Sequence, residues 1–146
     1  MRNLLTVVLL VVSFSFYGQS DEKREKIKAL KTAFFTTELS LSSEESAKFW
    51  PVYNSFDEKQ FELRHQKMKS LAKKLKNSID TMSDKEALAI LNQMESYDQE
   101  LLENRKKLVT NLKSIISPVK ILKLKKAEDD FNRTLLKQYK GKDRKG

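Results

Sequence analysis

Beyond residue 20, the apolar positions of the chain recur at intervals of three and four residues, which is the period of an amphipathic α-helix. The chain contains only three glycines and two prolines, so few points interrupt this pattern. We predict an all-α fold. The pattern indicates four helices joined by short connections, at residues 22–38, 42–76, 83–116 and 117–139.

Serine residues mark three of the predicted helix starts. Ser42 and Glu45 have the spacing of a capping box, in which the hydroxyl and the carboxylate each accept a backbone hydrogen bond from the other residue. Ser83 repeats this pattern with a glutamate three residues later. Ser117 precedes Pro118, and proline is favoured at the first helical position.

The second and third helices should each be roughly 50 Å long, which exceeds the width of a small compact domain. This length predicts an elongated antiparallel hairpin with two shorter flanking helices. With successive residues placed at 100°, the apolar side chains of residues 83–116 occupy an arc of roughly 140°, whereas those of residues 42–76 spread over roughly 200°. The wider arc predicts a second surface against residues 42–76: a second copy, a flanking helix or a bound client.

Charged residues within the two arcs predict the register of the hairpin. Asp57 with Arg105, and Arg64 with Asp98, have equal sums of residue numbers, as facing positions in an antiparallel pair do. We expect two partly exposed charge pairs here, each worth about 0–1 kcal/mol.

An aromatic block, Phe49–Tyr53, surrounds Pro51. Because this proline removes one backbone hydrogen bond, it predicts either a kink or a division of the helix. We predict that apolar residues in and after this block, flanked by basic residues, contact a client or partner. They are Phe49, Trp50, Phe56, Phe61 and Met68, with Lys48, Lys59, Arg64 and Lys67. The open alternative is that most of these aromatic side chains form the core or a dimer interface.

The ends of the chain differ from the helical part. Residues 1–20 have the pattern of a signal peptide, since Arg2 precedes an apolar run that is too short to cross a bilayer of about 30 Å. We therefore expect export to the periplasm with removal of this segment. Residues 21–140 are predicted to form one helical domain, and residues 141–146 a disordered basic tail.

The composition limits the classes of partner and the kinds of site that the sequence predicts. The net charge is +9, and for an exported protein it favours unfolded polypeptides, anionic lipid or envelope polymers as partners rather than nucleic acid. The chain has no cysteine and one histidine, His65, so a His/Cys metal site cannot be built within it. No catalytic triad or glycine-rich phosphate loop stands out. We predict a protein that is not an enzyme and uses no cofactor or metal.

Two segments, Leu41–Glu45 and Ile116–Lys120, each place a hydroxyl cap directly after an aliphatic residue. In this the chain resembles the Spy/CpxP group of bacterial periplasmic proteins, whose L-T-x-x-Q motif occurs twice. The resemblance covers about Lys26 to Leu136, and the family-motif residues are Leu41, Ser42, Glu45, Ile116, Ser117 and Lys120. Both copies depart from the motif at its final glutamine. Glutamate is favoured near a helix start, whereas lysine is not.

The resemblance implies a cradle-shaped antiparallel dimer that acts as an ATP-independent chaperone for unfolded envelope proteins during stress. The aromatic block also resembles that of secreted Bacteroidetes proteins labelled as sensors of extracytoplasmic-function sigma factors. This second likeness implies the alternative function, a regulatory subunit that binds a membrane-bound sensor or anti-sigma factor. A third hypothesis is electrostatic binding of envelope polymers or nucleic acid through residues 117–146.

Overall fold

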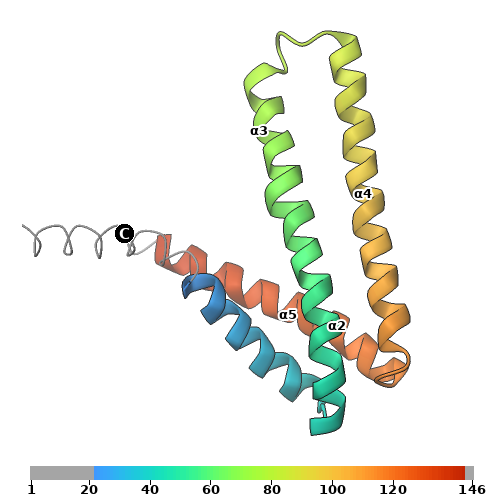
Figure 1. Cartoon of the computed structure of the whole chain (residues 1–146). Helices are drawn as coiled ribbons and strands as arrows, with labels where there is room; N and C mark the ends of the chain where they lie inside the picture. Colours follow the sequence, from blue (N-terminus) through green and yellow to red (C-terminus); the bar gives the residue numbers. More distant parts are fainter. Residues whose placement is uncertain (1–21, 144–146) are drawn as a thin grey trace, which may run out of the picture. The chain divides into compact units, whose positions relative to one another are not determined.

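The computed structural model describes residues 22–143, with the side chains of residues 22–138. This part of the chain is helical throughout apart from its connections, so the predicted all-α class is confirmed (Figure 1). The elements are a first helix at residues 22–39, α2 (Ser43–Phe61), the π-helix η1 (Glu62–Met68), α3 (Lys69–Ser78), α4 (Asp84–Leu112) and α5 (Pro118–Asp143). The predicted signal peptide and residues 144–146 lie outside the described residues, whereas residues 141–143 continue α5.

Two compact units make up the chain, and the predicted domain at residues 21–140 takes in parts of both. The long-helix unit is Leu41–Leu122, and the terminal unit combines the first helix with α5 from Lys123 onward. Within the long-helix unit the chain runs along α2, η1 and α3, turns at residues 79–83 and returns along α4 (Figure 1). Both α2 and η1 pack against α4.

The predicted serine caps are present at all three helix starts. The Ser42 hydroxyl accepts a hydrogen bond from the Glu45 N–H at 3.1 Å, and the Glu45 carboxylate accepts one from the Ser42 N–H at 3.0 Å. Ser83 and Ser117 each accept from the N–H three residues on, at 3.2 and 3.3 Å. These bonds satisfy backbone donors that a helix start leaves without internal partners.

The run from α2 to α3 keeps one face toward α4 by means of a single extra residue. Its core-facing side chains recur every seven residues, the interval that holds a face against a neighbouring helix, except for one interval of eight in each series. A π-turn encloses one residue more than an α-turn, and both longer intervals include residues of η1. The series are Phe49, Phe56, Leu63, Leu71 and Tyr53, Gln60, Met68, Leu75.

Most of the wide apolar arc lies within α2 itself. The spread of roughly 200° assumed a constant step of 100° per residue along the whole run. Among the described residues of α2, η1 and α3, no large apolar side chain is exposed. Val52 and Phe61, both within α2, lie near the two edges of this arc, so the change of pitch at η1 accounts for little of its width, and a second surface against residues 42–76 stays a prediction.

The aromatic block begins this core. The Phe49 ring stacks on Tyr53 with centroids 5.5 Å apart and meets Trp50 edge-on at 4.9 Å. Phe49 is fully buried, and α2 continues through Pro51, which excludes a division of the helix there. Mutual packing of large rings thus accounts for the aromatic density of this segment.

Amide side chains join the two long helices in place of one of the predicted charge pairs. The Asn104 side-chain amide donates to the Phe56 backbone carbonyl at 3.1 Å and to the Gln60 side-chain oxygen at 3.2 Å. Arg64 and Asp98 are both exposed, and no ion pair joins them in the described structure. A polar pair at seam positions fixes the register of paired helices, because other registers leave its partly buried groups without partners.

The terminal unit has its own aromatic core. Phe131 of α5 lies with its ring centroid 6.0 Å from that of Phe34 and 6.1 Å from that of Phe35, both on the first helix. Phe35 is fully buried and Phe131 almost so. Two segments far apart in the sequence therefore share one core.

Candidate functional site

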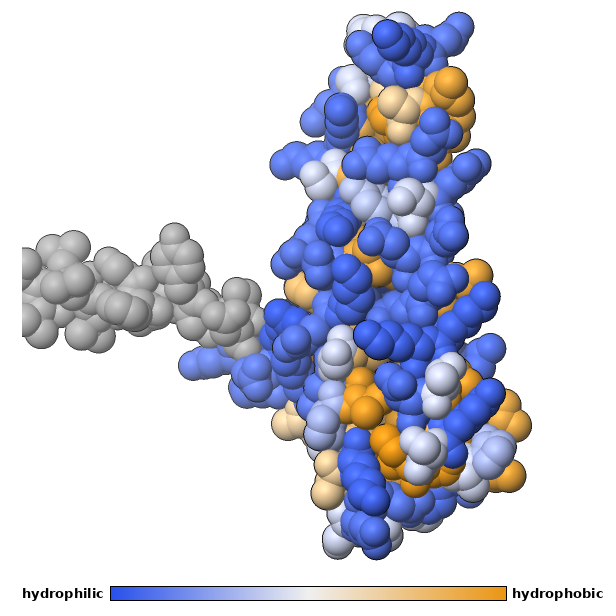
Figure 2. Space-filling model, turned by 45° about the vertical axis from the view of Figure 1, so that its right-hand side comes forward, coloured by the Kyte–Doolittle hydropathy of each residue, from blue (hydrophilic) through white to orange (hydrophobic). Residues whose placement is uncertain are grey.

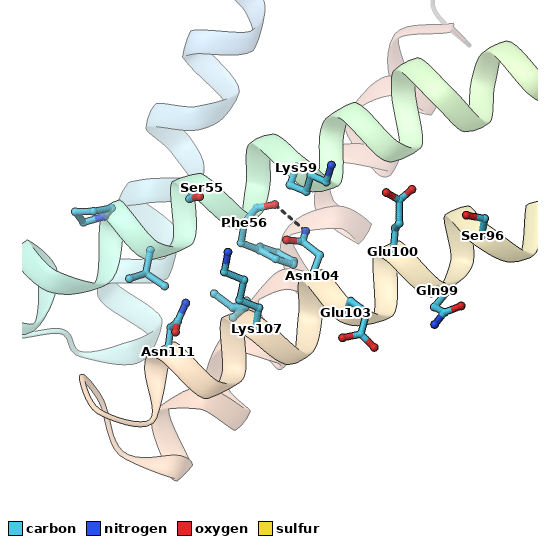
Figure 3. A pocket seen from close by; sticks show the side chains of 13 residues that line it. Ser55, Phe56, Lys59, Ser96, Gln99, Glu100, Glu103, Asn104, Lys107 and Asn111 are labelled. Atoms are coloured by element: carbon cyan, nitrogen blue, oxygen red, sulfur yellow. Dashed lines mark hydrogen bonds between the residues drawn. The ribbon is translucent and has the colours of Figure 1, made fainter. Parts of the chain in front are cut away.

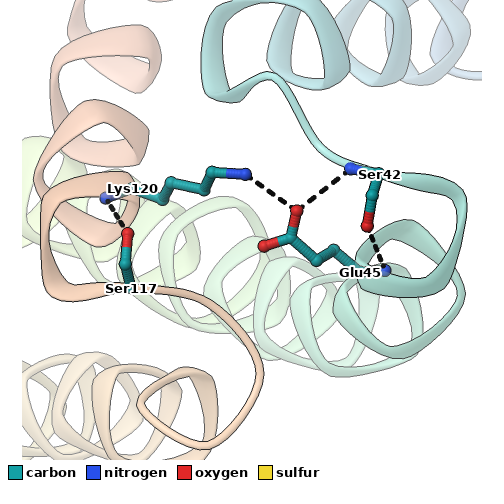
Figure 4. Close-up of polar contacts among 4 residues, drawn as sticks. All are labelled: Ser42, Glu45, Ser117 and Lys120. Atoms are coloured by element: carbon teal, nitrogen blue, oxygen red, sulfur yellow. Dashed lines mark hydrogen bonds and ion pairs between the residues drawn. The ribbon is translucent and has the colours of Figure 1, made fainter.

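The two motif-like segments meet through their fifth residues. The Lys120 ammonium lies 2.7 Å from the Glu45 carboxylate, which also accepts the Ser42 N–H (Figure 4). The hydrogen bond from Lys120 and that from the Ser42 backbone hold the pKa of Glu45 below its ordinary value. The two departures from glutamine are therefore complementary charges, and this arrangement links the start of α2 to the start of α5.

The motif cluster has the properties of a structural contact between two helix starts. It consists of Leu41, Ser42, Glu45, Ile116, Ser117 and Lys120. Both charged side chains are 24% exposed, Leu41 is half-buried and Ile116 is almost fully buried. All the polar contacts of Figure 4 are helix caps or the single ion pair. The polar groups of this cluster are therefore occupied by contacts within the chain.

A groove of about 910 Å³ lies between one side of α2 and the facing side of α4 (Figure 3). Its floor includes Phe56 and Leu108, both nearly buried, and charges of both signs rim it. The lining residues are Pro51, Val52, Ser55, Phe56, Lys59, Ser96, Gln99, Glu100, Glu103, Asn104, Lys107, Leu108 and Asn111. Amide and hydroxyl groups of this kind can donate to and accept from a polypeptide main chain.

The structure distributes the predicted partner-binding residues over several environments. Phe49 and Phe56 lie in the core, whereas Trp50, Phe61 and Met68 are half-buried. Of this set, only Phe56 and Lys59 line the groove together. The predicted role of the two core phenylalanines in client contact has no support in their exposure.

The basic residues that were predicted to flank the contact surface also lie in different environments. Lys48 is exposed and lies 3.7 Å from Glu44 on the same helix. Lys59 and Lys67 approach Glu62 at 3.9 and 3.5 Å, and Arg64 is exposed on η1. These contacts are weak surface pairs, and they leave the cations accessible to an acidic partner.

Exposed leucines on α4 form a surface that sequence reasoning did not single out. The exposed fractions are 58% for Leu88, 55% for Leu91, 40% for Met94 and 52% for Leu102. The apolar spacing of this helix predicted that Leu91, Met94 and Leu102 belong to one packed arc. Figure 2 shows hydrophobic patches separated by hydrophilic surface on the face that this view brings forward.

Two interleaved seven-residue series explain this surface. Ile90, Tyr97 and Asn104 are buried or half-buried and form the inner series. Leu88 and Leu102 belong to an outer series that lies two residues out of step with the inner one. A count of both series along α4 would have revealed its second apolar face.

Within residues 22–138, no cluster of three or more His, Cys, Asp or Glu side chains is placed to hold a metal ion. The ring of His65 stacks on Phe61 with centroids 4.8 Å apart. In the described part of the chain, no helix combines the length and apolar character needed to span a membrane.

The arrangement can therefore bind polypeptide through apolar, amide and charged contacts. This conclusion rests on the geometry alone. No family model matches the chain, and neither a curated protein nor a solved structure matches it.

Proposed function

We propose that the protein is an ATP-independent, chaperone-like binding protein for unfolded envelope polypeptides. The observation that carries this proposal is the row of exposed leucines on α4. They project from a helix that packing against α2 and η1 already orders, so a client pays little of the ordering cost. Burying a leucine side chain contributes about 1.5–3 kcal/mol when complete and less when partial, which suits weak and reversible capture.

Charge supports the same function. The net charge of +9 attracts acidic segments at long range and raises their rate of encounter. Exposed cations lie on η1, which packs against α4, and on α3, which follows it; they include Arg64, Lys69 and Lys73. Client capture should therefore weaken as ionic strength rises, because salt screens exposed charges.

The proposal includes the location and the assembly that the resemblance implies. We place the protein in the periplasm and expect an elongated hairpin that pairs with a second copy into a cradle-like dimer. Light scattering after size-exclusion chromatography tests the assembly. A monomer at every concentration would remove the dimer from the proposal, whereas capture of clients by single chains would remain.

Suppression of aggregation tests the function. Insulin reduced with dithiothreitol is a suitable client, because the protein contains no cysteine and the reductant leaves it unchanged. Without ATP, the protein should lower light scattering by the aggregating insulin, and the double variant Leu88→Ser/Leu91→Ser should lose most of this effect. Absence of suppression at several-fold molar excess would overturn the proposal.

The matched control is Leu136→Ser, which removes a leucine that is 60% exposed on α5. Substitution of exposed side chains usually changes stability by within about 0.5 kcal/mol, so both variants should fold. Equal loss of suppression in the control and the α4 variant would show that α4 is not the binding surface.

A further inference from the structure

The exposed face of α4 has the order of a helix-pairing surface. We define the outer seam as Leu88, Leu91, Glu95, Asp98 and Leu102, all of which are exposed. Leu88, Glu95 and Leu102 are separated by seven residues, and so are Leu91 and Asp98. This alternation of three and four residues is the spacing by which one helix presents a seam to another. The seam extends over about 21 Å at 1.5 Å per residue.

The physics of the backbone favours a helical occupant over an extended one. The N–H and C=O groups within α4 are paired inside the helix, so α4 offers no edge to which an extended strand can add. An extended segment lying on leucine side chains would lose water from its own backbone groups without gaining partners. A helix satisfies its backbone internally and brings only side chains to the seam.

The charges on the outer seam indicate whether a second copy of this chain or another protein binds there. Two carboxylates, Glu95 and Asp98, separate the leucines at the two ends of the seam. In an antiparallel self-pairing that sets Leu91 against Leu102 of the second copy, Glu95 faces Asp98, because the sums of their residue numbers are equal. A parallel self-pairing in register sets each carboxylate against itself. Like charges at such positions disfavour self-association.

We infer that the outer seam binds an amphipathic helix of another protein, and that this helix carries basic residues between two apolar turns. The apolar turns cover Leu88, Leu91 and Leu102, and the basic residues meet the carboxylates between them. The inference rests on the proposed function as a polypeptide-binding protein and names the conformation and charge pattern of the bound segment.

Synthetic peptides about three heptads long test this inference. The first carries leucine at the seam positions of its outer heptads and lysine at those of its central heptad. The second has glutamate in place of these lysines, and the third is the lysine peptide with prolines that prevent helix formation. Fluorescence anisotropy with the purified full chain should show the lysine peptide binding about tenfold more tightly than each of the others at low salt.

Variants of the seam make the test specific. Glu95→Lys/Asp98→Lys should reverse the preference between the lysine and glutamate peptides, whereas Glu22→Lys/Glu25→Lys, an exposed pair with the same spacing on the first helix, should leave it unchanged. Equal binding of all three peptides, or a preference that the seam variant does not reverse, would overturn the inference. A dimer that the seam variant disrupts would overturn it in favour of a second copy. Failure of the peptides with undiminished suppression of insulin aggregation would leave the proposed function standing alone.

Discussion

At the scale of single residues, opposite charges at the starts of α2 and α5 replace the glutamines of the resembled motif. The Glu45 carboxylate receives the Lys120 ammonium at 2.7 Å and the Ser42 N–H at 3.0 Å. A carboxylate that accepts such bonds is favoured in its ionised form, which is the reason for the lowered pKa. The Glu45 side chain thus serves both its own helix start and the contact between the two segments, whereas at the start of α5 it is the Lys120 backbone N–H that donates to Ser117.

The pH dependence of stability tests this ion pair. Because the pKa of Glu45 in the folded state lies below its ordinary value of 4.5, the stabilisation is present above that value and is lost as pH falls through the lowered pKa. Glu45→Gln should therefore be less stable than the unmodified protein at neutral pH, and the difference should shrink in acid. Urea unfolding across this pH range measures the difference.

The matched control for this prediction is Glu44→Gln, since Glu44 is largely exposed and its pair with Lys48 is longer, at 3.7 Å. This variant should show little change at any pH. A stability difference for Glu45→Gln that stays constant between neutral and acid pH would contradict the assignment of the effect to ionisation.

Backbone conformation at Ser40 supplies a second prediction at this scale. Ser40 has a φ of 50°, the left-handed region in which a side chain costs about 1–2 kcal/mol. Ser40→Gly should relieve part of this cost and stabilise the protein by about 0.5–1 kcal/mol. Thermal and urea unfolding measure the change.

The comparison variant is Ser70→Gly, at an exposed position inside α3. Glycine there should destabilise the protein by about 0.5 kcal/mol, because it lowers helix propensity. Destabilisation of similar size by both substitutions would show that the left-handed conformation at Ser40 carries no cost.

At the scale of elements, the helix starts were predictable and the π-helix was not. A cap depends on residues three positions apart, so the serines at 42, 83 and 117 identified the starts to within a residue. The extra residue of η1 depends on packing against α4, which no local pattern records. The same limit hid Gln60 and Asn104, whose amides join the helices although polar residues at seam positions are rarely assigned to a core.

Deletion of one residue within η1 tests the account of the two eight-residue intervals. Removing the exposed Gln66 should convert η1 to an α-helix and leave Leu71 and Leu75 facing α4. We expect the variant to keep its helical circular dichroism and to change in stability by less than about 1 kcal/mol.

Deletion of the exposed Glu58 in α2 is the matched control. It should rotate Gln60 and Leu63 away from α4 by about 100° and destabilise the protein by about 2–5 kcal/mol, the range for loss of a core leucine. If both deletions destabilise equally, η1 does not act as a one-residue insertion.

At the scale of the whole molecule, the candidate surface was only partly predictable. The third helix was expected to bury one apolar arc that includes Leu91 and Leu102, yet both of these residues are more than half exposed. Hydrophobic periodicity indicates which residues share a face, but not how many faces find a partner within one chain. For the same reason, the sharing of one core by residues 22–39 and 123–138 has no local signal, since the whole long-helix unit separates them in sequence.

The division into two compact units predicts that damage to one core stays local. Phe35→Ala removes a fully buried ring that contacts Phe131, which should cost the terminal unit about 3–5 kcal/mol. Amide hydrogen exchange should then accelerate in residues 22–39 and 123–138 and stay slow in α2 and α4, because their contacts lie within the long-helix unit. Leu63→Ala, which empties a buried position in η1, should produce the opposite pattern. Uniform acceleration by either substitution would mean that the two cores unfold as one cooperative body, since only a shared transition carries a local loss to every amide.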